Sequence, residues 1–258
     1  MRTLKLTLSY DGTAFVGWQR QADGTSIQGL LEAILSDIDG APVAVAGAGR
    51  TDAGVHALGQ VASCTLASAL DAGTLRKALN ARLPADVRVL AVDDVPQAFH
   101  ARFSATGKRY RYVLANGPMV SPFAARFTWQ VPGRLDVTAM QQAAAHLVGT
   151  HDFSAFQSTG TDVVHAVRTV TLAEIADLTD GPPPPLPAEA VPGGRLLAFE
   201  VAANGFLRHM VRALAGTLVE VGLRHRDPDL RALFESANRA LAGPTAPAHG
   251  LWLVEVNY

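Results

Sequence analysis

The sequence predicts an α+β protein of two lobes, each a β-sheet with helices on one face. Two observations support this fold class. Stretches with apolar residues at helical spacing alternate with extended apolar runs, and this order of elements occurs twice along the 258 residues. The first lobe is predicted to span residues 1–105 and the second residues 106–258. The halves share an order of elements rather than visible sequence identity.

Residue spacing defines the elements of the first lobe. In residues 26–39, apolar side chains recur at the i, i+3, i+4 and i+7 positions of an amphipathic helix, and Thr25 or Ser26 can cap it. Residues 2–10 alternate in polarity as a strand does. The predicted strands are 2–10, 41–46, 57–66 and 87–95, and the predicted helices are 26–39 and 74–83.

The second lobe is predicted in the same way. Its strands are 108–115, 169–175, 195–202 and 251–258, and its helices are 137–148, 206–221 and one that starts at Asp227-Pro228. Residues 178–194 contain a proline run that cannot join a β-ladder, so we expect a projecting loop between two strands.

Composition bounds the class of protein. No run of about eighteen apolar residues occurs and no cleavable signal precedes the first strand, so neither a membrane span nor export is expected. The single cysteine, Cys64, lies in an apolar run and cannot form an internal disulfide. These features indicate a cytoplasmic protein with a reduced core cysteine.

The charges are unevenly distributed although the net charge is only −1. Residues 100–112 carry four lysines and arginines and no acid, and residues 208–226 carry four arginines against one glutamate. Such clusters predict a positive groove that binds phosphates, and the alternative is a solvated surface of no special function.

The glycine-rich segment from Gly47 to His56 is the most informative motif. It places Asp52 on a connection between two predicted strands, with Arg50 two residues before it. In an extended chain these side chains share a face, so the arginine is expected to keep the carboxylate ionised. The spacing matches neither a dinucleotide fingerprint nor a P-loop. The alternative is an Asx turn, in which Asp52 bonds only nearby amides.

Several motifs together carry a family resemblance. They are Y-D-G-T-A-F-V-G-W-Q-R-Q from Tyr10, G-A-G-R-T-D-A-G-V-H-A from Gly47, F-H-A-R-F-S-A-T-G-K-R-Y-R-Y from Phe99, H-D-F-S-A-F from His151, and H-M-V-R from His209 with a later G-T-L-V-E-V-G. With them the chain resembles the tRNA pseudouridine synthase A family. One departure is Ala213, where the family usually has asparagine after M-V-R.

The resemblance implies a fold, a reaction and roles for individual residues. It implies ferredoxin-like lobes whose sheets meet around a central cleft, the pseudouridine synthase fold. It also implies that Asp52 is the catalytic nucleophile, that Tyr110 contacts the target base and that Arg50 helps to extrude it. The implied substrates are uridines at positions 38, 39 and 40 of the tRNA anticodon stem and loop, bound by a homodimer.

The residues of the second lobe add further candidates. Tyr110 stands between cations on a predicted strand, which suits stacking on a base, although a half-buried aromatic is the alternative. Tyr112 is expected to be such a half-buried aromatic. Arg208 and Arg212 lie at i and i+4 on the predicted helix 206–221, off its apolar stripe, and can reach the cleft as substrate-binding residues.

Metal or cofactor chemistry is not expected. None of His56, His100, His151 and His209 falls in a zinc-binding spacing, and His56 is expected to support Asp52 rather than to act as a base. Isomerisation of uridine needs no metal, no nucleotide cofactor and no ATP.

The chemical route and two other classes of function stay open. A carboxylate at Asp52 can attack C1′, add to C6 of the ring or remove a sugar proton. A non-catalytic RNA-binding module would bind tRNA without altering it. A glycoside hydrolase would need a second carboxylate in a defined partner position.

Overall fold

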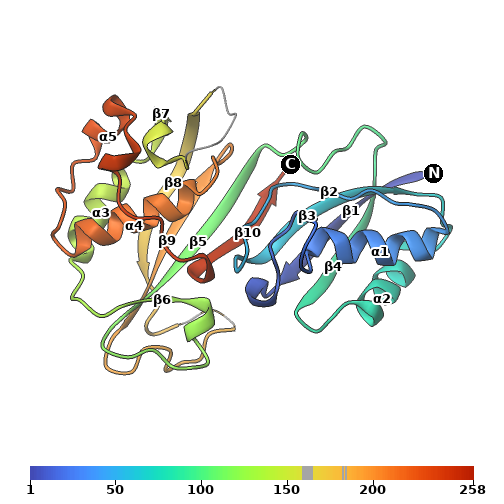
Figure 1. Ribbon diagram of the computed structural model, residues 1–258, viewed down its shortest axis with the longest axis horizontal. Coiled ribbons are helices and arrows are strands. Elements are labelled where there is room, and N and C mark those ends of the chain that lie inside the picture. Colours follow the sequence, from blue (N-terminus) through green and yellow to red (C-terminus); the bar gives the residue numbers. More distant parts are fainter. Residues whose placement is uncertain (159–164, 182, 184) are drawn as a thin grey trace. The chain divides into compact units, whose positions relative to one another are not determined.

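The computed structural model describes residues 1–158, 165–181, 183 and 185–258 (Figure 1). Its architecture is α+β, as predicted. The chain forms two compact units, one made of Met1–Thr106 with Trp252–Tyr258 and the other of Gly107–Leu251. The predicted second lobe, residues 106–258, differs from this division at the last strand, because that strand pairs in parallel with a strand of the first unit.

The first unit is a sheet with two helices. Its strands, in the order β4-β1-β3-β10, are β4 (Val87–Val95), β1 (Arg2–Tyr10), β3 (His56–Leu66) and β10 (Leu251–Asn257). Strand β1 is antiparallel to both of its neighbours. The two helices are α1 (Ile27–Asp39) and α2 (Ala72–Arg82) (Figure 1). Their buried side chains are Ile27, Leu31, Ile34 and Leu35 of α1 and Leu75 and Leu79 of α2. Ser26 caps α1 by accepting a hydrogen bond from Gly29 N, and Asp71 caps α2.

The second unit contains four long strands that are antiparallel to their neighbours. Its strands, in the order β5-β9-β8-β7, are β5 (Gly107–Asn116), β9 (Arg195–Ala203), β8 (Val167–Asp177) and β7 (Gly149–Asp152). The short β6 (Trp129–Val131) pairs in parallel with the end of β5. The helices are α3 (Val137–Ala145), α4 (Met210–Gly222) and α5 (Arg231–Ser236). Single 3-10 turns occur at Gly12–Ala14, Ala125–Phe127, Ser154–Phe156, Arg239–Leu241 and Ala248–Gly250.

The predicted strand 41–46 is wrong for most of its length. Only β2 (Ala46–Gly47) pairs with β3. The backbone N–H groups of Val43 and Val45 instead donate to Ser36 Oγ and Glu32 Oε1 of α1, at 2.9 and 3.2 Å. Because helix side chains satisfy these donors, the segment needs no neighbouring strand.

Two predicted helix starts are also wrong. Helix α4 begins at Met210 and not at Phe206, because His209 has a left-handed backbone with φ 62°. Helix α5 begins at Arg231, because Asp227 Oδ1 accepts a hydrogen bond from Asp229 N at 2.8 Å and forms a turn instead of a cap. The loop predicted for residues 178–194 does connect β8 and β9, with residues 182 and 184 outside the described part.

Candidate functional site

The backbone on both sides of Arg50 is fixed by buried side chains of the first unit. Gln60 Nε2, on β3, donates to Gly49 O at 3.0 Å, and Tyr10 Oη lies 2.8 Å from Thr51 Oγ1. Gln60 Nε2 also donates to the phenol oxygen at 3.4 Å, which leaves the Tyr10 O–H to donate to Thr51. Burial raises the pKa of Tyr10 to about 12, so the phenol keeps its proton.

Backbone contacts also hold Thr51 and Asp52. Trp18 N donates to Thr51 O at 3.0 Å. Gly17 has φ 105°, and a Cβ there would lie 2.5 Å from Thr51 O, so only glycine allows this approach of two backbones. Asp52 O accepts a hydrogen bond from Val55 N at 3.1 Å, and Gly54 has the positive φ of 79° that a type II turn requires at its third position. Asp52 therefore opens a tight turn.

The alternation of the chain turns Arg50 and Asp52 away from these anchors. Thr51 is buried, whereas Asp52 is half-buried and Arg50 is exposed. The guanidinium stands at the surface, where an anionic ligand can reach it.

His56, which follows this turn, is held by Gly12 and Trp252. Its imidazole is fully buried, stacks on Trp252 with ring centroids 4.5 Å apart, and accepts a hydrogen bond from Gly12 N at Nδ1, at 3.0 Å. Asp11 Oδ1 lies 3.2 Å from the same nitrogen, a pairing that would need a proton on Nδ1. Because the Gly12 N–H occupies that lone pair, the neutral imidazole carries its proton on Nε2.

In the second unit, Tyr110 lies on β5 and is 7% exposed. Its ring meets Phe206 edge to face, with centroids 5.0 Å apart and an interplanar angle of 82°. Tyr112, predicted to be a half-buried aromatic of the strand, is fully buried, and its Oη donates to Pro247 O at 2.7 Å.

Arg208 and Arg212 are held differently from each other. Arg208 is exposed and precedes α4, next to the left-handed His209, so the predicted i and i+4 relation on one helix does not hold. Ser158 Oγ lies 2.5 Å from His209 Nδ1, and Ser158 N donates to Arg208 O at 3.3 Å. Arg212 lies in α4, is half-buried, and its Nε donates to Ala246 O at 2.7 Å.

Comparison with known proteins identifies the family. A family model described as tRNA pseudouridine synthase matches residues 7–104 and 143–258. The chain belongs to the tRNA pseudouridine synthase family. Proteins named tRNA pseudouridine synthase A are similar over the whole chain. That of Myxococcus xanthus is 48% identical over 259 residues, which cover 92% of that protein. Those of Nitratidesulfovibrio vulgaris and Acetivibrio thermocellus are 45% and 41% identical over their full lengths. The family is one of isomerases, so this chain is an enzyme of that class.

Sequence reasoning missed a buried ion pair beside Tyr110. Arg111 Nε donates to Glu200 Oε1, and the two residues are directly opposite each other on β5 and β9. Glu200 is 6% exposed. The signal available was a single glutamate in the apolar strand that follows the proline-rich loop. Since Arg111 is neutralised inside the protein, it does not belong with the cations that were expected to bind phosphates.

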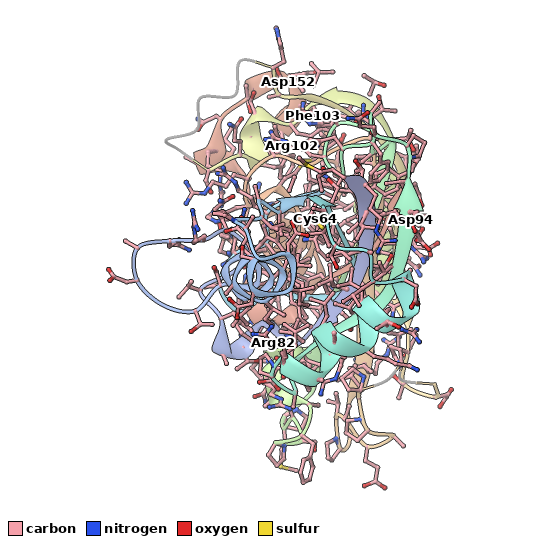
Figure 2. All side chains as sticks on the ribbon, turned by 90° about the vertical axis from the view of Figure 1, so that its right-hand side faces the viewer. Cys64, Arg82, Asp94, Arg102, Phe103 and Asp152 are labelled. Carbon is pink, nitrogen blue, oxygen red and sulfur yellow. The ribbon has the colours of Figure 1, made fainter. Side chains whose placement is uncertain are left out.

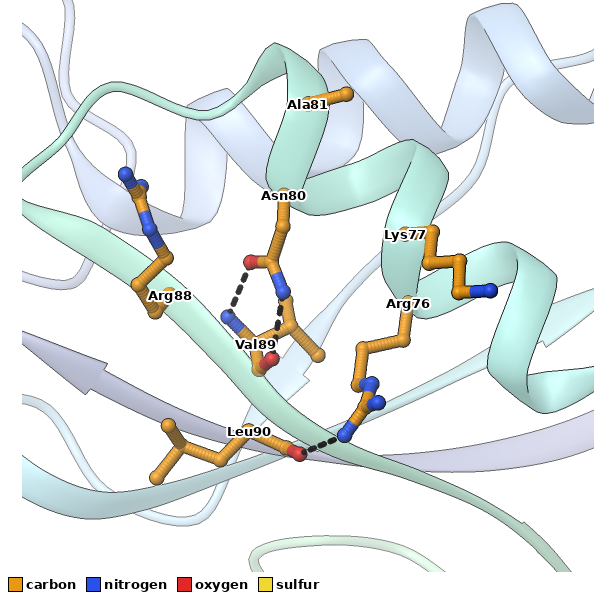
Figure 3. A pocket seen from close by; sticks show the side chains of 7 residues that line it. All are labelled: Arg76, Lys77, Asn80, Ala81, Arg88, Val89 and Leu90. Atoms are coloured by element: carbon orange, nitrogen blue, oxygen red, sulfur yellow. Dashed lines mark hydrogen bonds between the residues drawn. The ribbon is translucent and has the colours of Figure 1, made fainter.

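A pocket on α2 and β4 contains none of the predicted site residues (Figure 3). Asn80 Nδ2 donates to Val89 O and Asn80 Oδ1 accepts from Val89 N, both at 2.8 Å. Arg76 Nη1 donates to Leu90 O at 3.0 Å. Because β4 is the outer strand of this sheet, we infer that these side chains satisfy its free edge and that the pocket is structural.

Among the described residues, no group of three or more histidine, cysteine, aspartate or glutamate side chains is arranged to hold a metal ion. None of the described helices has the length and hydrophobicity needed to cross a membrane.

Proposed function

We propose that this enzyme isomerises uridine to pseudouridine at positions 38, 39 and 40 of the tRNA anticodon stem and loop. In that reaction the bond from C1′ to N1 breaks, the uracil turns, and a bond from C1′ to C5 forms. The C5 proton is lost and N1 gains one, so nothing is consumed. The observation that carries the proposal is the half-buried Asp52 at the start of a glycine turn, in a chain of this family. Buried side chains hold Gly49 and Thr51 before it, and the Val55 N–H bonds to its carbonyl oxygen.

Asp52 is proposed as the catalytic carboxylate and Arg50 as the residue that fills the space of the extruded base. A nucleotide has to leave its stack before its C1′ can be reached, at a cost of a few kcal/mol. An exposed arginine on a fixed backbone suits insertion, because its backbone ordering is complete before the RNA binds. Arg50 is exposed, and the backbone before it is held by the bond from Gln60 to Gly49 O.

Tyr110 is proposed to contact the extruded base, with Arg208 and Arg212 binding the RNA. The edge-on contact with Phe206 fixes the tyrosine ring. Arg208 is exposed and available to phosphates. We further propose that the enzyme acts as a homodimer in the cytoplasm, where its substrate would be recognised through backbone shape and 2′-hydroxyls, which suits tolerance of neighbouring positions.

The test is Asp52→Asn, with Asp23→Asn as the matched control because Asp23 is exposed and lies outside the turn. Asp52→Asn should lower pseudouridine formation by about 1,000-fold or more and keep tRNA affinity, whereas Asp23→Asn should behave as the wild type. The product is detected by a reagent that marks pseudouridine, because the modification does not change the mass. Normal turnover by Asp52→Asn would refute the role of the carboxylate. Release of free uracil by the wild type would indicate a hydrolase, and binding without modification would indicate an RNA-binding module.

A further inference from the structure

The loop that follows β4 presents an exposed aromatic ring. Phe103 is 77% exposed, and its ring centroid lies 4.4 Å from that of His100 and 5.7 Å from the Arg102 guanidinium carbon (Figure 2). Single exposed apolar residues are common on protein surfaces and need no function. A functional role for Phe103 therefore depends on the residues around it.

Hydrogen bonds close the backbone around this ring into a turn. His100 N donates to Ser104 Oγ at 3.1 Å, and Ser104 N donates back to His100 O at 2.9 Å. The imidazole Nδ1 accepts a hydrogen bond from Arg102 N at 3.1 Å. A ring on such a closed loop is already ordered, so a ligand that stacks on it loses little further conformational entropy.

The loop is also tied to the strand that carries the Asp52 turn. Ala101 N donates to Ser63 Oγ of β3 at 3.0 Å, and Tyr258 Oη donates to Ala101 O at 2.8 Å. Ala101 is fully buried and packs with Ala48 and Val61. Ala48 is part of the glycine-rich motif that contains Asp52, so the loop and the motif share one small core.

The charge of the segment selects the kind of ligand. Residues 96–112 contain no acid, and the two residues whose side chains flank the ring are an arginine and a histidine. An exposed aromatic beside cations is the combination that binds single-stranded nucleic acid, because the ring stacks on a base while a guanidinium meets the adjacent phosphate. An apolar protein partner would not need this absence of acids.

We propose that Phe103 stacks on an unpaired base of the RNA substrate other than the target uridine, and that Arg102 binds the neighbouring phosphate. The proposal rests on tRNA being the substrate, since an anticodon loop offers unpaired bases. It adds a second contact point for RNA, separate from the reacting atoms. Its expected signature is an effect on KM and on tRNA affinity with kcat kept.

The test compares Phe103→Leu and Phe103→Trp with Phe123→Leu, a matched control because Phe123 is also 77% exposed but lies in the other unit. Phe103→Leu should weaken the binding of an unmodified tRNA about 5- to 30-fold, and Phe103→Trp should bind at least as well as the wild type. The control should stay within about two-fold, since surface substitutions elsewhere have small effects. Arg102→Gln should reduce the slope of log affinity against log salt by about one.

Three outcomes would overturn the inference. Unchanged tRNA affinity in Phe103→Leu would remove the ring from the RNA contact. An equal loss in the Phe123→Leu control would indicate a non-specific surface effect. A change in molar mass by light scattering at unchanged RNA affinity would assign Phe103 to a contact between copies of the chain. If the wild type binds tRNA but forms no pseudouridine, the proposed reaction fails while the effect of Phe103 on binding remains measurable.

Discussion

The hydrogen bond between Tyr10 and Thr51 offers a direct test of how the Asp52 turn is held. Tyr10→Phe removes the phenol oxygen and leaves the Thr51 hydroxyl, on a residue that is 6% exposed, without this partner. Leaving a buried hydroxyl unsatisfied costs about 1–3 kcal/mol of unfolding free energy. Gln60 keeps its bond to Gly49 O at 3.0 Å, so we expect a value near the lower end, about 1–1.5 kcal/mol.

Activity should fall by more than stability alone explains. A shift of about 1 Å in a reacting group costs on the order of 100-fold in rate, so kcat should fall about 10- to 100-fold while tRNA affinity changes little. The control is Ser36→Ala, which removes the bond to Val43 N in the same unit without touching the turn. It should lose comparable stability and keep kcat.

The double variant Tyr10→Phe/Thr51→Val completes a double-mutant cycle for this hydrogen bond. Replacing both partners by apolar groups of similar shape should restore most of the stability, with a coupling energy of about 1 kcal/mol. Stability is measured by urea unfolding and kcat by single-turnover assays on tRNA. Wild-type kcat and wild-type unfolding in Tyr10→Phe would refute the idea that this bond positions the carboxylate.

Two further predictions concern stability. Burial raises the pKa of the Cys64 thiol to about 12, so between about pH 9 and pH 12 the unfolded thiol loses its proton first and stability falls with rising pH, by about 1.4 kcal/mol per pH unit from this group. Cys64→Ala should show a correspondingly shallower alkaline loss in urea unfolding, and an identical slope would contradict the assignment. Asn80→Ala exposes the N–H and C=O of Val89 on the outer strand, so it should cost about 1–2 kcal/mol and promote self-association while kcat is kept. Light scattering and thermal melts measure both effects, and a variant that melts and scatters like the wild type would contradict it.

Local signals in the sequence predicted the elements whose structure is determined locally. Helix α1 begins where Ser26 can cap it and ends before Gly40, which has φ 73°. The turn at Asp52 follows from the glycine pattern, because Gly54 supplies the positive φ that the turn requires. Such features depend on residues within a few positions of one another.

The features that the sequence did not predict depend on distant partners. The start of α4 depends on His209, whose ring lies 2.5 Å from Ser158 Oγ, far away in the chain. The short β2 depends on α1 side chains that satisfy its preceding N–H groups. The placement of β10 depends on its parallel pairing with β3. No local period encodes these contacts, so the spacing of residues could not reveal them.

The proposed catalytic carboxylate and the proposed stacking ring depend on one strand. Within the first unit, β3 supplies Gln60, which holds Gly49, and Ser63, which holds Ala101. Both side chains are almost completely buried, so each hydrogen bond forms in a medium that strengthens it and penalises its loss. In each segment the anchored residue is small or buried, and the neighbouring Arg50, Arg102 and Phe103 are exposed. This division lets a chain of net charge −1 place cations and an aromatic ring on a fixed backbone, because Gln60 and Ser63 of β3 bind the backbone of Gly49 and Ala101.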